Sequence, residues 1–219
     1  MSLLFAAIVA LTNTFGSVSV DTFGARVLSY VPAGGNETLA MLPSGYGGIP
    51  LCWPWFQFNG PEGEKGGKHG IARYCEFDLV DVFESSASGR IVMELKSDAG
   101  TRRKWPYDFS LTLNVALDCR GLTLSLTGVN TGEKEFSVTE AFHPYLLRRE
   151  LEKIENSGSG VFRTWNPNAG SHLRTTGLGP EDWRIFVCVE NGTFDRERAY
   201  VLKPGQSNVL SRTIAPLRK

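Results

Sequence analysis

Two residues of this chain have the types and settings needed for proton transfer. His143 follows Phe142 and precedes Pro144, an apolar setting that holds a histidine pKa near or below neutrality. A proton donor working at neutral pH needs that range. Glu190 ends the apolar run 185–189, where partial burial would raise the pKa of its carboxyl and make it a usable base. The two residues predict acid–base catalysis, against the alternatives of a histidine packed in a sheet and an ordinary charge at a strand end.

A third candidate, His69, lies near the end of a glycine- and charge-rich loop over residues 57–70. Gly70 follows it and would let the backbone approach a ligand closely. Arg73 comes four residues after His69, a spacing that places both side chains on one face if the segment is a strand. We therefore expect His69 and Arg73 to bind a small polar molecule. The alternative is an exposed loop histidine without a role.

An aromatic cluster precedes this loop. Trp53, Trp55 and Phe56 belong to the run 47–56, which also contains two prolines. A sugar ring has apolar C–H faces that can stack on such side chains, while its rim needs hydrogen bonds. The three aromatic residues are thus expected either to contact a sugar ring or to form core, as most tryptophans do.

Length, composition and charge limit the function classes. The 219 residues fit a single domain over 1–219, since β-sandwiches of this length often stay undivided. Hydrophobic residues make up 42% of the chain, enough for a sizeable core. The 23 basic and 23 acidic residues give zero formal net charge. Charge therefore does not favour nucleic acid or an anionic membrane as a partner.

The four cysteines lie in apolar or strand-like contexts and form no CxxC pair. Zinc-site spacing and a disulfide framework are therefore not indicated, and reduced thiols in a cytoplasmic protein are expected. The apolar stretch over residues 3–11 is too short to span a bilayer, and no Lys or Arg precedes it. We expect it to be an opening β-strand rather than a removed signal peptide.

Apolar and polar residues alternate through much of the chain, as they do in half-buried β-strands. The clearest case is 109–117, and 122–126 continues the pattern after a turn at 120–121. Turn residues recur about every ten positions, which is typical of an antiparallel sandwich or barrel. The predicted fold class is all-β, with irregular, function-bearing loops at 57–70 and 155–182. Further strands are expected at 77–83, 91–95, 136–138, 185–189 and 199–202.

Taken in order, these motifs resemble the hexose-6-phosphate mutarotase group of the aldose 1-epimerase family. The resemblance spans most of the chain from residue 16 onward and rests on the ordered set rather than on any one motif. The matching segments are 47–50 (GGIP), 53–56 (WPWF), 69–73 (HGIAR), 105–106 (WP) with Phe109, 130–132 (NTG), 139–143 (TEAFH), 187–190 (VCVE) and 202–205 (LKPG).

The resemblance implies a galactose-mutarotase-like antiparallel β-sandwich (a supersandwich) that binds an aldose on a concave sheet face. It implies that Glu190 removes the proton from the anomeric hydroxyl and that His143 protonates the ring oxygen, so that the ring opens and recloses as the other anomer. His69 would hydrogen-bond the ring or assist the acid, and Arg73 would orient sugar hydroxyls. No metal site and no organic cofactor are implied, since proton transfers suffice.

Two departures from the group's pattern concern the substrate. Phosphate-binding members carry an arginine just before Gly-Gly-Ile-Pro, where this chain has Tyr46 and Gly47. Arginine binds phosphate through paired donors that a lysine does not match; Lys65, Lys68 and Arg73 are the candidates to replace it. Members also have an aspartate after the second histidine, and none lies between 148 and 165.

The expected function is therefore the interconversion of the α and β anomers of an aldose, chiefly a hexose 6-phosphate, by a monomer or weak dimer. A mutarotase for unphosphorylated sugar is the first alternative. A carbohydrate-binding module that has lost catalysis is the second, and it belongs to a different functional class.

Overall fold

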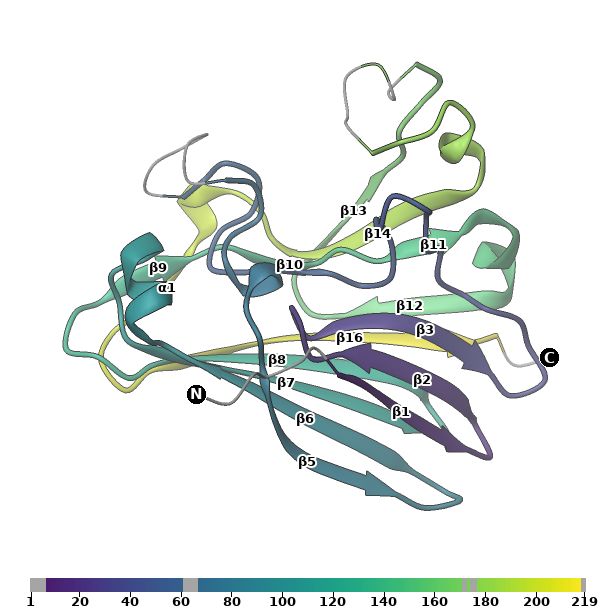
Figure 1. Cartoon of the computed structure of the whole chain (residues 1–219), viewed down its shortest axis with the longest axis horizontal. Helices are drawn as coiled ribbons and strands as arrows, with labels where there is room; N and C mark the ends of the chain where they lie inside the picture. The colour runs from purple at the N-terminus through teal and green to yellow at the C-terminus, as the bar shows by residue number, and fades with distance from the viewer. Residues whose placement is uncertain (1–6, 61–66, 171–172, 174–176, 218–219) are drawn as a thin grey trace.

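The computed structural model describes residues 7–60, 67–170, 173 and 177–217. Period-two alternation builds its larger sheet, because every second residue of β7 (Phe109–Asp118) is buried. This antiparallel sheet has six strands in the order β12-β16-β8-β7-β6-β5 (Figure 1). Its other strands are β5 (Asp78–Glu84), β6 (Gly89–Lys96), β8 (Gly121–Asn130), β12 (Ile154–Gly158) and β16 (Ser207–Pro216).

Two smaller sheets pack against the large one and complete the sandwich. In the five-stranded sheet, β14 pairs with β13 on one side and with β10 and β11 on the other, and β4 pairs with β10. The three-stranded sheet β1-β2-β3 contacts the large sheet through β1 and β2. The strands are β1 (Ile8–Asn13), β2 (Gly16–Asp21), β3 (Arg26–Pro32), β4 (Leu51–Cys52), β10 (Glu140–Phe142), β11 (Tyr145–Leu147), β13 (Val161–Trp165) and β14 (Phe186–Thr193).

The remaining strands form a short pair, β9 (Phe136–Val138) with β15 (Tyr200–Leu202), and the α-helix is α1 (Ala99–Lys104). Within the described part of the chain, no helix combines the length and hydrophobicity needed to cross a membrane.

The core between the sheets connects the aromatic segment 53–56 to the end of the loop that follows it. The Trp53 side chain is fully buried and contacts the rings of Trp105 and Phe109, with centroids 5.0 and 4.6 Å away. Its carbonyl oxygen accepts hydrogen bonds from the backbone N–H groups of Ile71 and Ala72, at 2.9 and 3.1 Å. The core therefore fixes both ends of the 57–70 loop, including the end that carries the candidate histidine.

The all-β prediction is confirmed, and every strand predicted between 77 and 202 is present. The prediction of an irregular segment over 155–182 is wrong at its start, where β12 and β13 lie. All five residues of β13 are exposed, so this strand lacks the alternation on which the prediction relied. The predicted opening strand is present as β1 from Ile8 onward, and residues 3–6 of that stretch lie outside the described residues.

Gly70 is the glycine on which the loop closure depends. Its φ is +77°, and a Cβ atom at this position would clash with the Trp53 carbonyl. We expect Gly70→Ala to lower the free energy of unfolding by at least about 2 kcal/mol, since a left-handed backbone and a backbone clash add together. Gly34→Ala is the matched control, because its φ is +68° with nothing near the added carbon. Urea unfolding of both variants measures the difference, and equal losses would contradict the closure argument.

Candidate active site

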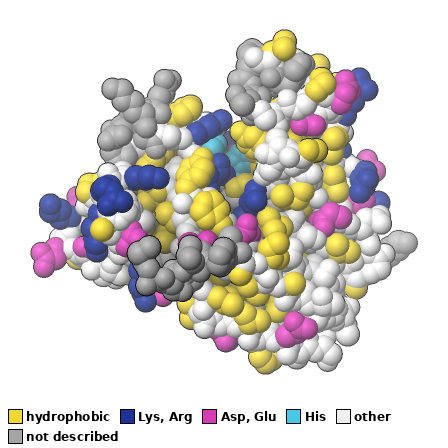
Figure 2. Space-filling model, viewed as in Figure 1, with side chains coloured by type: hydrophobic (Ala, Val, Ile, Leu, Met, Phe, Trp, Pro, Cys, Tyr) yellow, Lys and Arg dark blue, Asp and Glu magenta, His cyan; other side chains and the backbone are white. Residues whose placement is uncertain are grey.

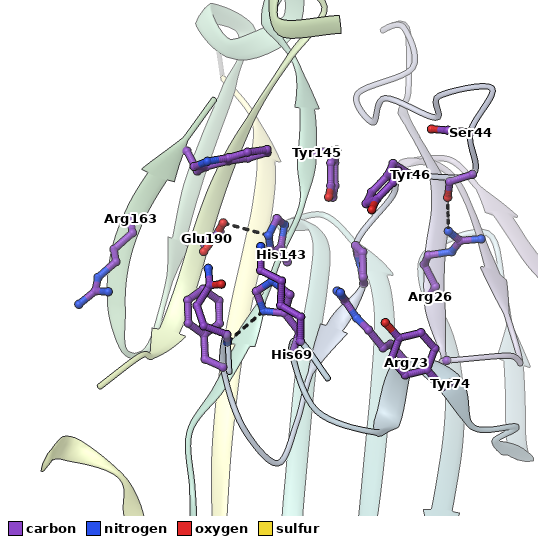
Figure 3. Close-up of a pocket in the computed structure, with 18 of the residues that line it drawn as sticks. Arg26, Ser44, Tyr46, His69, Arg73, Tyr74, His143, Tyr145, Arg163 and Glu190 are labelled. Atoms are coloured by element: carbon purple, nitrogen blue, oxygen red, sulfur yellow. Dashed lines mark hydrogen bonds and ion pairs between the residues drawn. The ribbon is translucent and has the colours of Figure 1, made fainter. Parts of the chain in front are cut away.

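A cavity of about 640 Å³ opens beside β14. Its walls come from segments far apart in sequence: β13 and β14, the junction of β10 with β11, the loop end at 68–74, and the segments 23–26 and 44–47. Figure 2 shows histidine side chains in the hollow, and Figure 3 shows the lining side chains arranged around it. Cavities of this size hold small-molecule ligands in proteins.

Strand register brings His143 and Glu190 together. β10 and β11 share one register against β14, with Phe142 opposite Asn191 and Tyr145 opposite Cys188, so His143 faces Glu190 across the ladder. The backbone N–H of His143 points away from β14, to the Pro50 carbonyl. The two residues therefore form a non-hydrogen-bonded cross-strand pair, in which side chains come closest. His143 Nε2 lies 3.1 Å from Glu190 Oε1 (Figure 3).

Burial shifts the pKa values of this pair in opposite directions. It raises the pKa of Glu190 to about 7, against the lowering effect of Lys68, Arg163 and Arg73. Burial, followed by the charge of Arg73, lowers the pKa of His143 to about 3. Because the two groups are in contact, they titrate as one unit. Both shifts have the expected direction, but the pKa of His143 lies far below the range that a proton donor needs at neutral pH.

His69 lies against the same pair and has a defined tautomer. Its ring is 5.3 Å from that of His143, edge-on, and is buried. Its Nδ1 accepts a hydrogen bond from the Gln57 backbone N–H at 3.3 Å. Burial and the nearby Arg73 lower the pKa of His69 well below its usual range, so the neutral ring carries its proton on Nε2. His69 can therefore donate one hydrogen bond to a ligand in the cavity.

Arg73 lines the cavity, but not for the reason predicted. His69 has a left-handed backbone with φ +69°, and Arg73 lies in a 3₁₀ turn over Ala72–Tyr74, so the expected shared strand face is absent. Arg73 Nε donates to the Leu51 carbonyl at 3.1 Å. No carboxylate pairs with it among the residues that the structure describes. Lys68 is exposed at the rim of the cavity, whereas Lys65 lies outside the described residues.

The three aromatic residues of the predicted cluster do not share one environment. Trp53 belongs to the core and Trp55 lines a separate cavity, while Phe56 lines the cavity beside β14. The stacking hypothesis is therefore wrong for Trp53, which is fully buried, and for Trp55, whose Nε1 donates to the Gly67 carbonyl. Trp165 is one of several exposed aromatic residues that line the cavity; it is 41% exposed, and its ring lies 6.5 Å from that of His143.

Two further arginines of the cavity were missed in the sequence. Arg163 stands opposite Glu190 across the β13–β14 ladder and pairs with Asp195 at 2.8 Å. Arg26 begins β3 and donates from Nη1 to the Gly45 carbonyl at 2.7 Å. Neither belongs to a local motif, so a signal for them would have required the strand pairing. Tyr46, which stands where the resembled group has its arginine, also lines the cavity.

One group of side chains has atoms placed as metal ligands could be. An atom of His143, one of Cys188 and one of Glu190 lie within 4.8 Å of one another. Burial and the Glu190 carboxylate raise the pKa of the Cys188 thiol far above its usual range. Zinc and related metals bind the thiolate, so the protonated sulfur makes this trio a weak candidate for a metal centre.

Comparisons with known proteins agree with the fold and with the motifs. The sequence model of the aldose 1-epimerase family matches residues 44–166. The chain is 33% identical over 146 residues to an Escherichia coli protein named "Putative glucose-6-phosphate 1-epimerase", covering 63% of this chain and 47% of that protein. A Salmonella typhimurium protein of the same name gives the same identity and coverage. The chain thus spans about half the length of the curated relatives it matches.

Solved structures show the same fold at lower identity. A "putative mutarotase" from Salmonella typhimurium superposes with a TM-score of 0.79 at 20% identity, covering 100% of this chain and 92% of that one. A galactose mutarotase-like protein from Lactobacillus casei gives 0.70 at 16% identity, covering 96% and 100%. The predicted galactose-mutarotase-like sandwich is confirmed.

The raised Glu190 pKa has a consequence for stability. Between 4.5 and about 7, the folded state binds more protons at this group than the unfolded state, so its contribution to the free energy of unfolding falls as pH rises. Glu190→Gln removes this loss and should stabilise the protein near pH 8 by about 1 to 3 kcal/mol. Near pH 4 the carboxyl is mostly protonated in both states, and the difference should nearly vanish. Urea unfolding at both pH values measures it; an equal gain at both would contradict the ionisation argument.

Proposed function

Because the chain belongs to the aldose 1-epimerase family, we propose that it interconverts the α and β anomers of an aldose, with a hexose 6-phosphate as the substrate. The 3.1 Å contact between His143 Nε2 and Glu190 Oε1 is the observation that carries the proposal. The anomeric hydroxyl and the ring oxygen are bonded to the same carbon. A base and an acid that serve both atoms must therefore be immediate neighbours, as these two side chains are.

One proton shared by the pair satisfies both roles. Burial favours this proton on the Glu190 carboxyl. The reactive arrangement has it on His143 Nε2, which leaves Glu190 as a carboxylate, so that acid and base are present together. Glu190 takes the proton from the anomeric hydroxyl, the bond between the anomeric carbon and the ring oxygen breaks, and His143 protonates that oxygen. Rotation about the C1–C2 bond and the reverse transfers close the ring on the other face. Both residues recover their starting states, and no metal or organic cofactor is needed.

The remaining lining residues suit the binding of a sugar. The Nε2–H of His69 can hydrogen-bond the ring or its hydroxyls, and Arg73 has donors free of any described carboxylate. Phe56 and Trp165 offer apolar surface for the C–H faces of the ring. This replaces the earlier stacking assignment to Trp53 and Trp55, while Phe56, Lys68 and Arg73 keep their proposed binding roles.

A phosphate group would lie at the end of the cavity away from Glu190. Arg26, Tyr46 and Arg73 gather on that side (Figure 3). Arg163, on the Glu190 side, is already paired with Asp195. We therefore assign the role of the missing arginine to Arg26, with Arg73 adding positive charge. Charge-assisted donors of this kind bind phosphate strongly.

An enzyme for unphosphorylated sugar remains the second candidate, favoured by Tyr46 at the position of the group's arginine. A non-catalytic sugar-binding module is the third. The cytoplasmic location, the single domain and the monomeric or weakly dimeric state remain predictions. All four cysteines are free in the structure, which supports the first of these.

The decisive measurement is the anomerisation of freshly dissolved α-glucose 6-phosphate, followed by polarimetry beside α-glucose and α-galactose. We expect acceleration of the phosphate sugar, and a loss of about 10²-fold or more in rate for Glu190→Gln and for His143→Ala. Glu197→Gln is the matched control, because this glutamate is exposed and outside the cavity.

If Glu190→Gln or His143→Ala kept full activity, the role assigned to that residue would be wrong. If only an unphosphorylated sugar were accelerated, the assigned substrate would change and the proposed mechanism would stand. A folded protein that accelerates none of the three, yet is protected by them against heating, would support the binding module.

Two arginine variants separate phosphate binding from sugar binding. Arg26→Ala should raise KM for glucose 6-phosphate by about tenfold or more, since a lost charge-assisted contact costs about 1.5 to 3 kcal/mol, and leave KM for a free sugar unchanged. Arg73→Ala should raise KM for both sugars more than it lowers kcat. Steady-state kinetics measure both effects; equal effects of Arg26→Ala on the two sugars would contradict its assignment to phosphate.

A further inference from the structure

The ladder beside Glu190 lacks one backbone donor. The N–H groups of His143 and Tyr145 point to the carbonyls of Pro50 and Gly48 on the β4 side. The intervening residue, Pro144, therefore faces β14, and the shared register places it opposite Val189. Proline has no N–H to donate. The Val189 carbonyl, immediately before Glu190, is thus left without its ladder partner.

Arg212 supplies the missing donor from the opposite sheet. It lies on β16 at a core position between the buried residues Leu210 and Ile214. Its Nη1 donates to the Val189 carbonyl at 2.7 Å and to Asn191 Oδ1 at 3.0 Å. One guanidinium therefore holds the residues on both sides of Glu190, and it contacts them from the core, behind the cavity.

The rest of the network fixes the guanidinium and Asn191 in turn. Arg212 Nη2 donates to Asn156 Oδ1 at 2.5 Å. The Asn191 amide donates to the carbonyls of Ser159 and Ser211, both at 2.9 Å. These contacts join β12, β14 and β16 at the level of Glu190, so a displacement of β14 here would break several hydrogen bonds together.

This arrangement is costly for the fold. The Arg212 side chain is fully buried, and no carboxylate pairs with it in the described part of the chain. Its Nε has no hydrogen-bond partner there either. Burial lowers the pKa of Arg212 to about 9. An apolar residue at such a position is often neutral or stabilising, so stability alone gives little reason for an arginine.

We propose that Arg212 is a positioning residue: it replaces the N–H that Pro144 lacks and thereby holds Glu190 opposite His143. The inference rests on the proposed function for its kinetic part only. It predicts that the need for Arg212 disappears when position 144 regains an N–H.

The test is a rescue experiment on anomerisation kinetics. Arg212→Met should lower kcat by about 10- to 100-fold with a small change in KM, since a misplaced base weakens the chemical step more than binding. Adding Pro144→Ala to that variant provides an N–H opposite Val189 and should restore most of kcat. The single variant Pro144→Ala is the matched control and should stay near wild type. Arg212→Met with unchanged kcat, or a double variant without recovery, would overturn the proposal.

A second variant keeps the test valid if Arg212→Met does not fold, and a second measurement keeps it valid if the wild-type protein is inactive. If Arg212→Met does not fold, Arg212→Lys, with and without Pro144→Ala, gives the same comparison. Nitrogen-15 NMR of His143 Nε2 reports its hydrogen bond to Glu190 without any substrate. We expect this signal to change in the Arg212 variant and to return in the double variant. If wild type has no activity but the signal follows this pattern, the proposed function fails and the positioning role stands; an unchanged signal overturns the positioning role.

Discussion

The register between β14 and the interrupted strand β10–β11 is the constraint on which the site depends. It makes His143 and Glu190 direct cross-strand neighbours. A slip of one residue would exchange the two faces of β14, turning Glu190 into the core and Val189 into the cavity. The large sheet and its apolar core hold this register, because Val189 and Asn191 on the other face of β14 contact groups that belong to that core.

The buried ionisable side chains of the candidate site lower the stability of the sandwich. Glu190, His143 and His69 are all buried, and each has a pKa shifted toward its neutral form. Burying ionisable groups opposes folding unless they are paired. The long strands of the large sheet offset this cost with closely packed apolar side chains. A β-sandwich with a large core can therefore keep several unfavourable groups on one face.

Much of the fold could be predicted from the sequence, because a strand with one buried face shows alternating apolar and polar residues, as in 109–117. His143 and Glu190, the proposed acid and base, were also accessible as candidates, since both residues stand in apolar local settings. The failures have a common cause: β13, Arg26 and Arg163 depend on pairing between distant segments, and no local pattern encodes it. Trp53 shows a different limit of prediction from sequence, because residue type alone does not distinguish a core aromatic side chain from one that binds a ligand.

The central place of β14 has a consequence for how the chain can be divided. The family match ends at residue 166, whereas β14 begins at Phe186 and carries Glu190. A fragment cut at the limits of that match would keep His69, Arg73 and His143 but leave β10, β11 and β13 without their common partner. His143 and Glu190 would then be on separate polypeptides, and neither piece would contain the complete five-stranded sheet. The smallest autonomous unit is therefore set by hydrogen-bond connectivity through β14, and it extends beyond the region that the family model matches.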